Sequence, residues 1–181
     1  MNRLIAVVGL PGSGKSEVVA EFVASGFVKI YFGGLTLEKL NEAKLEVNEG
    51  NERMIREKLR ADHGMAVFAK LNIPKIKSSL SSNNIVIDGL YSWEEYLVLR
   101  EKFPNLEVVA VYAPPQMRYA RLAARPIRPL SEEECRSRDH TQIENLHQAG
   151  PIAIAQHTIV NTGDISILKK MVSEVINAKK S

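Results

Sequence analysis

Residues 9–16 read Gly9-Leu10-Pro11-Gly12-Ser13-Gly14-Lys15-Ser16, which is the pattern G-x-x-x-x-G-K-S. An apolar segment at 4–8 precedes this stretch and has the composition of a strand that is buried on both faces. The segment at 17–24 follows it, with apolar residues at helical spacing and Gly26 as a stop signal. A strand, a glycine-rich turn and a helix in this order form the context that a phosphate-binding P-loop requires.

The residue types of this loop suit the phosphates of a nucleoside triphosphate. Glycines let successive backbone N–H groups face one concavity, and the following helix adds the positive end of its dipole. Lys15 can reach the β- and γ-phosphates, and the Ser16 hydroxyl can bind Mg²⁺. A glycine-rich turn could match the pattern by accident, but the flanking strand and helix argue against that. We therefore expect ATP and Mg²⁺ as cofactors, bound by Gly9, Pro11, Gly12, Ser13, Gly14, Lys15 and Ser16.

The length and composition of the chain limit its class. Its 181 residues fit one domain, which can bury roughly 70% of the surface of the unfolded chain. The hydrophobic content of 45% and the charged content of 25% are ordinary for a globular protein. The net charge of +3 is small and the basic residues are not massed into one block, which argues against nucleic acid as the main partner.

The sequence also bears on the compartment. No apolar run reaches the length of a membrane span, and the N-terminus has the pattern of a core strand rather than of a signal peptide. Cys135 is the one cysteine, so neither an internal disulfide nor a cysteine-based metal site is expected. The four histidines have no metal-ligand spacing. We therefore expect a cytoplasmic protein with no membrane partner.

Short apolar segments predict five strands that alternate with helices. They lie near 4–8, 27–31, 84–88, 107–112 and 157–160. This alternation predicts an α/β fold of three layers, with a doubly wound, parallel, five-stranded sheet between helices. In such a sheet ligands bind at the carboxyl ends of the strands, where the P-loop also lies.

Capping and stop signals place helices between the strands. We expect Thr36 to cap a helix that runs to Val47, and Asn51 to cap a second helix that ends near Gly64. Pro74 is expected to interrupt a third helix.

Similar signals mark the second half of the chain. Ser131, followed by three glutamates, is expected to cap a helix that continues to about Leu146. Residues 151–155 are expected to lead directly into the last strand, and residues 165–178 have the pattern of an amphipathic helix.

An acid lies at the carboxyl end of the predicted strand Asn84-Ile85-Val86-Ile87-Asp88-Gly89. In P-loop proteins such an acid holds Mg²⁺, usually through water. The alternative is an aspartate that caps the next loop, because a strand that ends in Asp is by itself a weak pattern. With the P-loop upstream, we expect Asp88 to be a catalytic and metal-side residue.

Four arginines follow the fourth strand at spacings of three, four and three residues: Arg118, Arg121, Arg125 and Arg128. The first three share one helical face. One interpretation is a solvated basic face, which is common. The other is a helix that brings guanidinium groups to a transferring phosphoryl group. We expect Arg121 and Arg125 to be catalytic in this way and leave Arg118 open between the two interpretations.

Four motifs together carry a resemblance to a known family: the P-loop, the I-V-I-D-G strand end, the R-x-x-R-x-x-x-R helix and the closing I-V-N-T-G-D. They look like the nucleoside monophosphate kinase branch of the P-loop kinases, and the similarity extends to dephospho-coenzyme A kinases. The order of the segments resembles most closely that of small adenylate-kinase-related proteins found in archaea. The resemblance covers nearly the whole chain, although only the P-loop is highly specific.

This resemblance implies roles for individual residues. The P-loop would bind the donor phosphates and Mg²⁺, and Asp88 would face the metal and the acceptor. Arg121 and Arg125 would belong to the helix on the lid side and clamp the phosphates, with Arg138 beyond the lid.

The resemblance also implies a division of the single domain at 1–181. A helical insertion at 33–80 would cover the acceptor, and a short lid would span 126–134. The loop over the adenine would consist of Asn161, Thr162 and Gly163.

Two departures from the family pattern concern the acceptor. Family members usually carry G-D-x-x-R after the second strand, where this chain has Gly33-Gly34-Leu35-Thr36-Leu37. They often carry an arginine shortly after D-G, where this chain has Leu90-Tyr91-Ser92. Both places lack the arginine that commonly grips an acceptor phosphate. Arg53, Arg56 and Arg60 are substitutes, and Arg60 best fits the family position for acceptor binding.

The combined features favour an ATP-dependent phosphotransferase that moves the γ-phosphoryl group to a small nucleotide-like acceptor. A dephospho-coenzyme A kinase is an alternative enzyme, although the D-G strand end argues against it. A third alternative is a nucleotide-binding regulatory protein with slow ATPase activity and no acceptor. The acceptor, the preference for ATP over GTP and the oligomeric state stay open.

Overall fold

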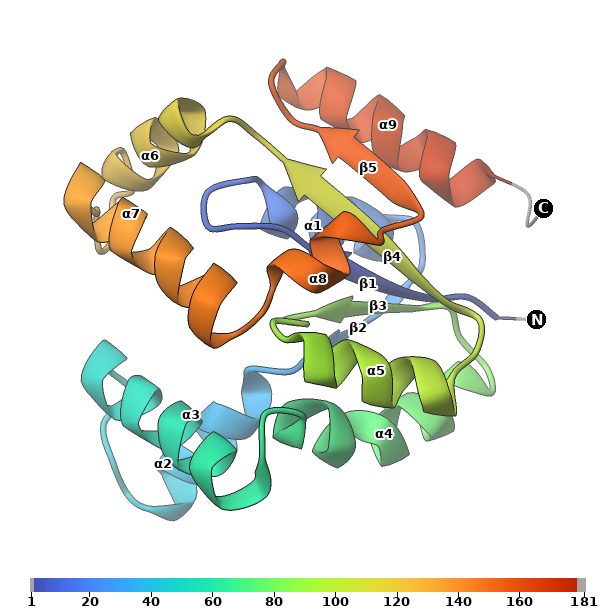
Figure 1. Ribbon diagram of the computed structural model, residues 1–181. Helices are drawn as coiled ribbons and strands as arrows, with labels where there is room; N and C mark the ends of the chain where they lie inside the picture. The colour runs from blue at the N-terminus through green and yellow to red at the C-terminus, as the bar shows by residue number, and fades with distance from the viewer. Residues whose placement is uncertain (1, 179–181) are drawn as a thin grey trace.

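Five parallel strands form the centre of the protein, in the order β2-β3-β1-β4-β5 (Figure 1). A computed structural model describes residues 2–178; residue 1 and residues 179–181, which the expected domain includes, lie outside the described part. The strands are β1 (Leu4–Val8), β2 (Val28–Tyr31), β3 (Ile85–Asp88), β4 (Leu106–Tyr112) and β5 (His157–Val160). The predicted parallel α/β sheet and all five of its strands are thus confirmed, with bounds that differ by at most one residue.

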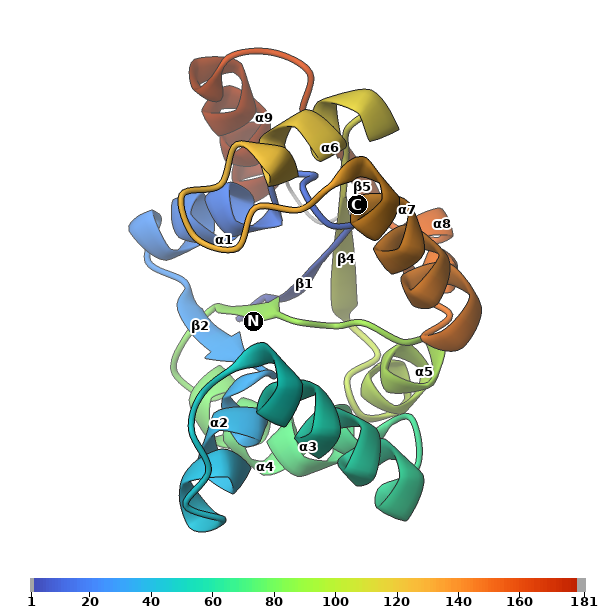
Figure 2. The same cartoon turned by 90° about the vertical axis from the view of Figure 1, so that its left-hand side faces the viewer.

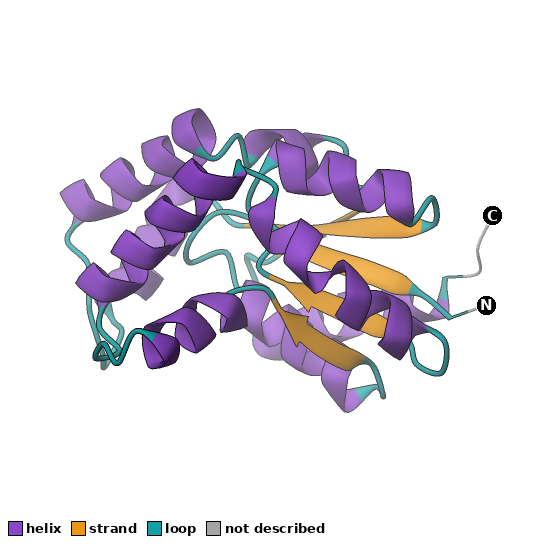
Figure 3. Cartoon of the chain, turned by 90° about the horizontal axis from the view of Figure 1, so that it is seen from below, coloured by secondary structure: helices purple, strands orange, loops and turns teal. Residues whose placement is uncertain are grey.

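Helices cover both faces of the sheet, which gives three layers (Figure 3). One face packs against α1 (Lys15–Ala24) and α9 (Ile165–Asn177). The other face packs against α4 (Val67–Leu80) and α5 (Trp93–Lys102). Alternate residues of β1 belong to opposite faces, and all five are buried, as expected for a central parallel strand.

The remaining helices are α2 (Gly34–Glu42), α3 (Glu49–His63), α6 (Pro115–Ala123), α7 (Glu132–His140) and α8 (Ala149–Ala153). Figure 2 looks onto the carboxyl end of the sheet, around which α1, α3, α6 and α7 are arranged. No helix within residues 2–178 is both long enough and apolar enough to span a membrane.

The expected start and end of the helix from Thr36 to Val47 were wrong. Helix α2 begins at Gly34, and Thr36 is a buried residue inside it rather than its cap. The helix ends at Glu42 because Lys44 adopts a left-handed backbone with φ of 53°. Val47, which was expected to extend the apolar face, is 63% exposed, so a longer helix would gain no burial there.

The cap of α3 lies three residues before the expected one. Asn48 adopts an extended backbone, and its side chain accepts a hydrogen bond of 2.9 Å from the backbone N of Asn51. Asn51 therefore lies in the first turn of the helix, and its backbone N–H is the donor that pairs with the side chain of Asn48. Two asparagines three residues apart offer the same local signal, and the extended backbone of Asn48 decides between them.

Helix α4 runs through Pro74 instead of stopping there. A proline inside a helix costs about 3 kcal/mol, because it removes a hydrogen bond and crowds the preceding turn. Both halves of α4 are anchored in the core, the first by Phe68 and the second by Ile76, and this burial offsets that cost.

The segment between α7 and the last strand also differs from expectation. The capping box of Ser131 and Glu134 forms as predicted, but α7 ends at His140 and continues as a π-helical turn over Thr141–Asn145. The short helix α8 occupies Ala149–Ala153 and buries Pro151, so it overlaps the segment at 151–155 that was expected to lead into the last strand.

Candidate functional site

The P-loop forms a tight turn between β1 and α1. Gly12 and Gly14 adopt left-handed backbones, with φ of 76° and 99°. A Cβ atom on Gly12 would lie 2.6 Å from the carbonyl oxygen of Arg118, and one on Gly14 would lie 2.2 Å from Nδ2 of Asn161. The backbone of Arg118 leaves no room for a Cβ atom at Gly12, and the left-handed backbone at both positions favours glycine.

Lys15 folds back over this loop. Its Nζ atom donates hydrogen bonds to the carbonyl oxygens of Gly9, at 2.6 Å, and Leu10, at 3.0 Å. Burial lowers the pKa of the Lys15 ammonium group to about 8, and the carboxylate of Asp88 opposes this shift. At pH 7 the group is still mostly protonated, so a cation lies beside the first two residues of the P-loop.

A cavity of ≈ 530 Å³ opens beside the P-loop. It brings together residues that the sequence places far apart. The expected site residues that line it are Pro11, Gly12, Gly14, Lys15, Ser16, Asp88, Arg121, Arg125, Arg138, Asn161 and Gly163. Four other expected residues lie outside this lining: Gly9, Ser13, Thr162 and Arg60.

The side chain of Ser13 is buried within the P-loop and is 1% exposed. Its Oγ atom has no hydrogen-bond partner among the described residues. A buried hydroxyl without a partner carries a desolvation cost, which a hydrogen-bonding ligand would remove. Together with the glycine cradle and the cation of Lys15, this atom fits the triphosphate of a nucleotide.

Asp88 lies at the carboxyl end of β3, in register with Val7 of the neighbouring strand β1. Its Oδ2 atom is 2.7 Å from Nζ of Lys29, a residue of β2 that sequence reasoning did not single out. Asp88 and Ser16 both line the cavity. A hydroxyl and a carboxylate, completed by water and phosphate oxygens, are the ligand set that Mg²⁺ commonly takes, so the residues present fit this ion.

Residues 2–178 contain no group of three or more His, Cys, Asp or Glu side chains that could hold a metal ion. A site at Ser16 and Asp88 would therefore contribute few protein ligands. Mg²⁺ is bound in this manner in many nucleotide enzymes, because the substrate phosphates and water supply the other oxygens.

The structure decides the question that was left open for Arg118. The residue is 3% exposed, and its guanidinium group forms two hydrogen bonds with the carboxylate of Asp139, at 2.8 and 2.6 Å. It also donates to the carbonyl oxygens of Ala113 and Pro11, at 3.1 and 3.0 Å. Arg118 thus ties α6 and α7 to the P-loop and belongs neither to a solvated face nor to the cavity lining.

Arg121 and Arg125 both line the cavity, but from different kinds of structure. The Nη2 atom of Arg121 donates to the carbonyl oxygen of Asn161 at 3.0 Å, and its Nη1 atom donates to that of Gly12 at 3.4 Å. Arg121 is therefore held over the P-loop. Arg125 lies beyond the end of α6 at Ala123 and is exposed, so the helical face that it was expected to share does not extend to it.

Asn161 connects the last strand to the P-loop. Its backbone N donates to the carbonyl oxygen of Tyr112 at 2.7 Å, and its Nδ2 atom donates to that of Ser13 at 2.8 Å. These bonds place the loop at 161–163, which the resemblance expects to lie over the adenine, beside the start of α1.

Arg60, the expected acceptor residue, packs within the helical layer. Its guanidinium carbon is 5.2 Å from the centroid of the Phe68 ring, and its Nε atom is buried without a partner among the described residues. Burial lowers the pKa of Arg60, opposed mainly by the carboxylate of Glu95. Its role in acceptor binding stays a prediction.

Four residues of the cavity lining were missed by sequence reasoning: Glu17, Tyr91, Gln142 and Ile165. Tyr91 follows Asp88 by three residues, and burial raises the pKa of its phenol. Gln142 lies in the π-helical turn, and its Oε1 atom is buried without a partner among the described residues. The proximity of Tyr91 to Asp88 in the sequence was a usable signal. Gln142 had none, because a π-helical turn has no clear sequence pattern.

Behind Tyr91 lies a fully buried carboxyl group, that of Glu95. Its Oε2 atom accepts hydrogen bonds from the backbone N atoms of Tyr91, at 2.8 Å, and Ser92, at 3.2 Å. Burial nevertheless raises the pKa of Glu95 to about 7. The carboxyl fixes the turn that presents Tyr91 to the cavity.

Comparison with protein families gives one match over most of the chain, to a family described as "AAA domain", which covers residues 5–145. A UPF0200 protein of Thermococcus kodakarensis is 34% identical over 183 residues, which cover 96% of this chain and 98% of that protein. A UPF0200 protein of Thermococcus onnurineus is also 34% identical and covers 96% of each chain.

Solved structures share the fold at lower identity. The structure of TT1252 from Thermus thermophilus has a TM-score of 0.65 at 21% identity and covers 97% of each chain. A shikimate kinase from Bacteroides thetaiotaomicron has a TM-score of 0.59 at 17% identity and covers 96% of each chain. At these identities the similarity shows the fold alone.

Proposed function

The chain belongs to the AAA domain family and to the UPF0200 proteins. From this family, the fold that it shares with solved kinases and the residues around its P-loop, we propose that it is an ATP-dependent phosphotransferase. The proposed reaction moves the γ-phosphoryl group of ATP to a small nucleotide-like acceptor. Nucleotide binding at the P-loop would not depend on the identity of the acceptor.

One observation carries the proposal. Lys15 at the start of α1 and Arg121 on α6 both line the cavity, and both donate hydrogen bonds to backbone oxygens of the same P-loop. Two cations held over one glycine cradle suit the clustered negative charge of a triphosphate more than that of a single phosphate.

The proposed mechanism follows from these positions. Bound ATP would supply the phosphoryl group, and Ser16 and Asp88 would hold Mg²⁺, which would supply positive charge beside the phosphates. Lys15 would stabilise the charge that develops on the transferring group, and Arg121 and Arg125 would clamp it from the α6 side. The loop at 161–163 would hold the base against the start of α1.

The basic residues on the acceptor side contact other groups of the protein. Arg56 forms ion pairs with Glu49 at 3.2 Å and with Glu52 at 3.1 Å. Lys29 pairs with Asp88, and Arg60 stacks on Phe68. These contacts support an acceptor that is not gripped by a free arginine pair, in keeping with the two family arginines that the sequence lacks.

The expected segments fit this proposal. Helices α2 and α3, from the insertion at 33–80, would cover the acceptor, whereas α4 packs on the sheet. The connection at 126–134 would serve as the lid, since Arg128 in it contacts Glu49 of α3 at 3.3 Å.

Two alternatives remain of interest. A dephospho-coenzyme A kinase would use the same donor site with a larger acceptor. A regulatory protein would bind ATP, hydrolyse it slowly and phosphorylate no acceptor, and the missing acceptor arginines are the observation that favours it.

Titration with MgATP tests the nucleotide binding on which the proposed function depends. Wild type is expected to bind, and Lys15→Ala is expected to lose most of this affinity, because it removes the P-loop cation that contacts the β- and γ-phosphates. Lys102→Ala is the matched control, since Lys102 pairs with Glu101 at an exposed end of α5. Equal affinity of the Lys15→Ala variant and wild type would contradict the assignment of the P-loop.

A further inference from the structure

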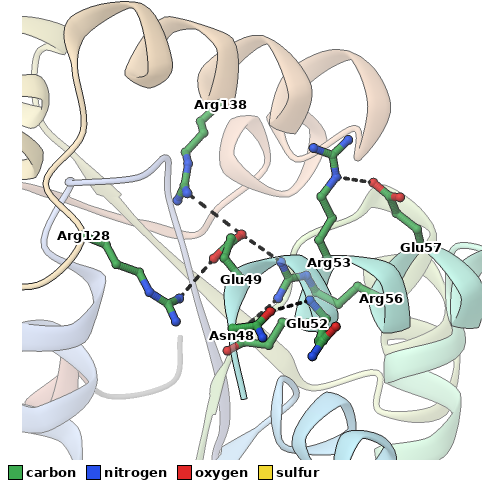
Figure 4. A network of polar contacts seen from close by, with 9 residues as sticks. Asn48, Glu49, Glu52, Arg53, Arg56, Glu57, Arg128 and Arg138 are labelled. Atoms are coloured by element: carbon green, nitrogen blue, oxygen red, sulfur yellow. Dashed lines mark hydrogen bonds and ion pairs between the residues drawn. The ribbon is translucent and has the colours of Figure 1, made fainter. Parts of the chain in front are cut away.

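The carboxylate of Glu49 lies among three arginines at the edge of the candidate site (Figure 4). Its Oε1 atom is 3.2 Å from Nη2 of Arg56 and 4.0 Å from Nη2 of Arg138. Its Oε2 atom is 3.3 Å from Nη1 of Arg128. One carboxylate thus serves as the shared anion of three guanidinium groups.

The three arginines come from separate parts of the chain. Arg56 is on α3, two turns after Glu49 itself. Arg128 lies in the connection between α6 and α7, where its backbone is left-handed with φ of 55°. Arg138 is on α7 and lines the cavity beside the P-loop. Glu49 therefore joins the helical insertion to the segments on the opposite side of the site.

Other acidic residues of α3 do not make such a connection. Glu57 pairs with Arg53 at 2.7 Å, and Glu52 pairs with Arg56 at 3.1 Å, both four residues apart on the same helix. Pairs of this kind support the helix locally. On α3, within the described residues, Glu49 is the acid that forms ion pairs with other parts of the chain.

The contacts of Glu49 are weak enough to exchange. Glu49, Arg128 and Arg138 are each between 42% and 51% exposed at the side chain, and one of the distances is at the limit for an ion pair. Exposed pairs shift an equilibrium by less than about fivefold. Phosphate offers an arginine more charge and more acceptor oxygens than a carboxylate does, so it is the stronger partner.

We propose that Glu49 is an internal competitor for phosphate-bearing ligands: it holds Arg128 and Arg138 when the site is empty and must release them when a ligand binds. The proposal rests on the proposed function, because it takes the cavity beside the P-loop as a polyphosphate site. Glu49 would thereby set the affinity of the site without contacting the reacting atoms.

The test compares binding of two probes, MgATP and inorganic tripolyphosphate, to wild type and to Glu49→Gln. Removal of the competing charge is expected to tighten the binding of both probes by about two- to fivefold at low salt, and by less at high salt. Glu57→Gln is the matched control on the same helix and should bind both probes as wild type does. Thermal unfolding checks that all variants remain folded.

A second comparison assigns the effect to the arginines. In a protein that carries both Arg128→Met and Arg138→Met, the further change Glu49→Gln should no longer tighten the binding of tripolyphosphate. A double-mutant cycle requires this result of residues that act together. A tightening that persists in this background would overturn the proposal, as would unchanged or weaker binding by Glu49→Gln alone.

The outcomes also separate this inference from the proposed function. If wild type binds MgATP and Glu49→Gln binds it no more tightly, only the role of Glu49 fails. If neither protein binds either probe, the polyphosphate site itself is wrong and both proposals fail. If Glu49→Gln binds the probes and wild type does not, Glu49 prevents binding, as the proposed competition requires.

Discussion

The Nζ atom of Lys29 lies 2.7 Å from Oδ2 of Asp88, across the neighbouring strands β2 and β3. The acid that is proposed to hold Mg²⁺ therefore already has a cation beside it. An ion and an ammonium group that share one carboxylate must compete for its negative charge.

This relationship predicts the effect of Lys29→Met. Without the ammonium group, half-saturation of ATP binding should need a several-fold lower Mg²⁺ concentration, which a titration at fixed ATP measures. Lys39→Met is the control, because Lys39 pairs with the exposed Glu42 on α2. A higher Mg²⁺ requirement in Lys29→Met would mean that Lys29 itself contacts the nucleotide or acceptor.

Arg121→Ala and Arg125→Ala should lower kcat more than they raise KM for ATP. Contacts made mainly in the transition state appear in kcat, by about 10³-fold or more for an arginine that stabilises phosphoryl transfer. Steady-state kinetics with an identified acceptor measure both constants. Arg136→Ala is the control, since Arg136 pairs with Glu132 on the exposed side of α7. A change confined to KM would assign both residues to binding alone.

Glu95→Gln should change how stability depends on pH. The pKa of the Glu95 carboxyl is about 7 in the folded protein against 4.5 ordinarily, because the group is buried. Between these values the folded protein holds a proton that the unfolded chain has released, so the free energy of unfolding falls as pH rises. The loss is complete above pH 7 and amounts to at most about 3 kcal/mol.

Denaturant unfolding of wild type and Glu95→Gln at pH 5, 6, 7 and 8 measures this difference. The stability of the variant relative to wild type should rise across this range, because the amide of Gln does not titrate between pH 5 and pH 8. A constant difference between the two proteins from pH 5 to pH 8 would show that Glu95 does not titrate in this window.

The sequence predicted the sheet well because its signals are local. Each strand is a short apolar run bounded by polar or glycine residues, and a buried parallel strand requires such a run on both faces. The P-loop was predicted for a similar reason. Its glycines, Lys15 and Ser16 are adjacent in the chain, so one pattern contains the whole cradle.

The rest of the site depends on contacts between distant residues. No local pattern distinguishes Arg118, which is buried against Asp139, from Arg121, which is held over the P-loop. Likewise, Glu49 resembles any acid in the first turn of a helix until Arg128 and Arg138 are brought beside it. The roles of such residues depend on which distant residues pack beside them. Composition and periodicity carry no information about these contacts.

AMP is expected to be a poor acceptor. The family positions after β2 and after Asp88 carry Gly33-Gly34-Leu35 and Leu90-Tyr91-Ser92 in place of arginines that grip a phosphate. An acceptor phosphate without these partners keeps much of its desolvation cost, which raises KM and misplaces the attacking oxygen. Coupled assays with AMP, CMP, UMP, GMP and dephospho-coenzyme A measure this. Turnover of AMP near or above the median enzyme rate of about 10 s⁻¹ would show that other residues replace these arginines.

The fate of the γ-phosphoryl group tests phosphotransfer most directly. The protein is incubated with Mg²⁺, ATP labelled at the γ-phosphate, and the small-molecule fraction of a cell extract as a pool of acceptors, with Lys15→Ala in parallel. We predict that label appears in an organic product with wild type and is absent from it with Lys15→Ala. Label that remains in ATP, or that appears only as inorganic phosphate with every acceptor pool, would contradict a phosphotransferase and favour a nucleotide-binding regulatory protein.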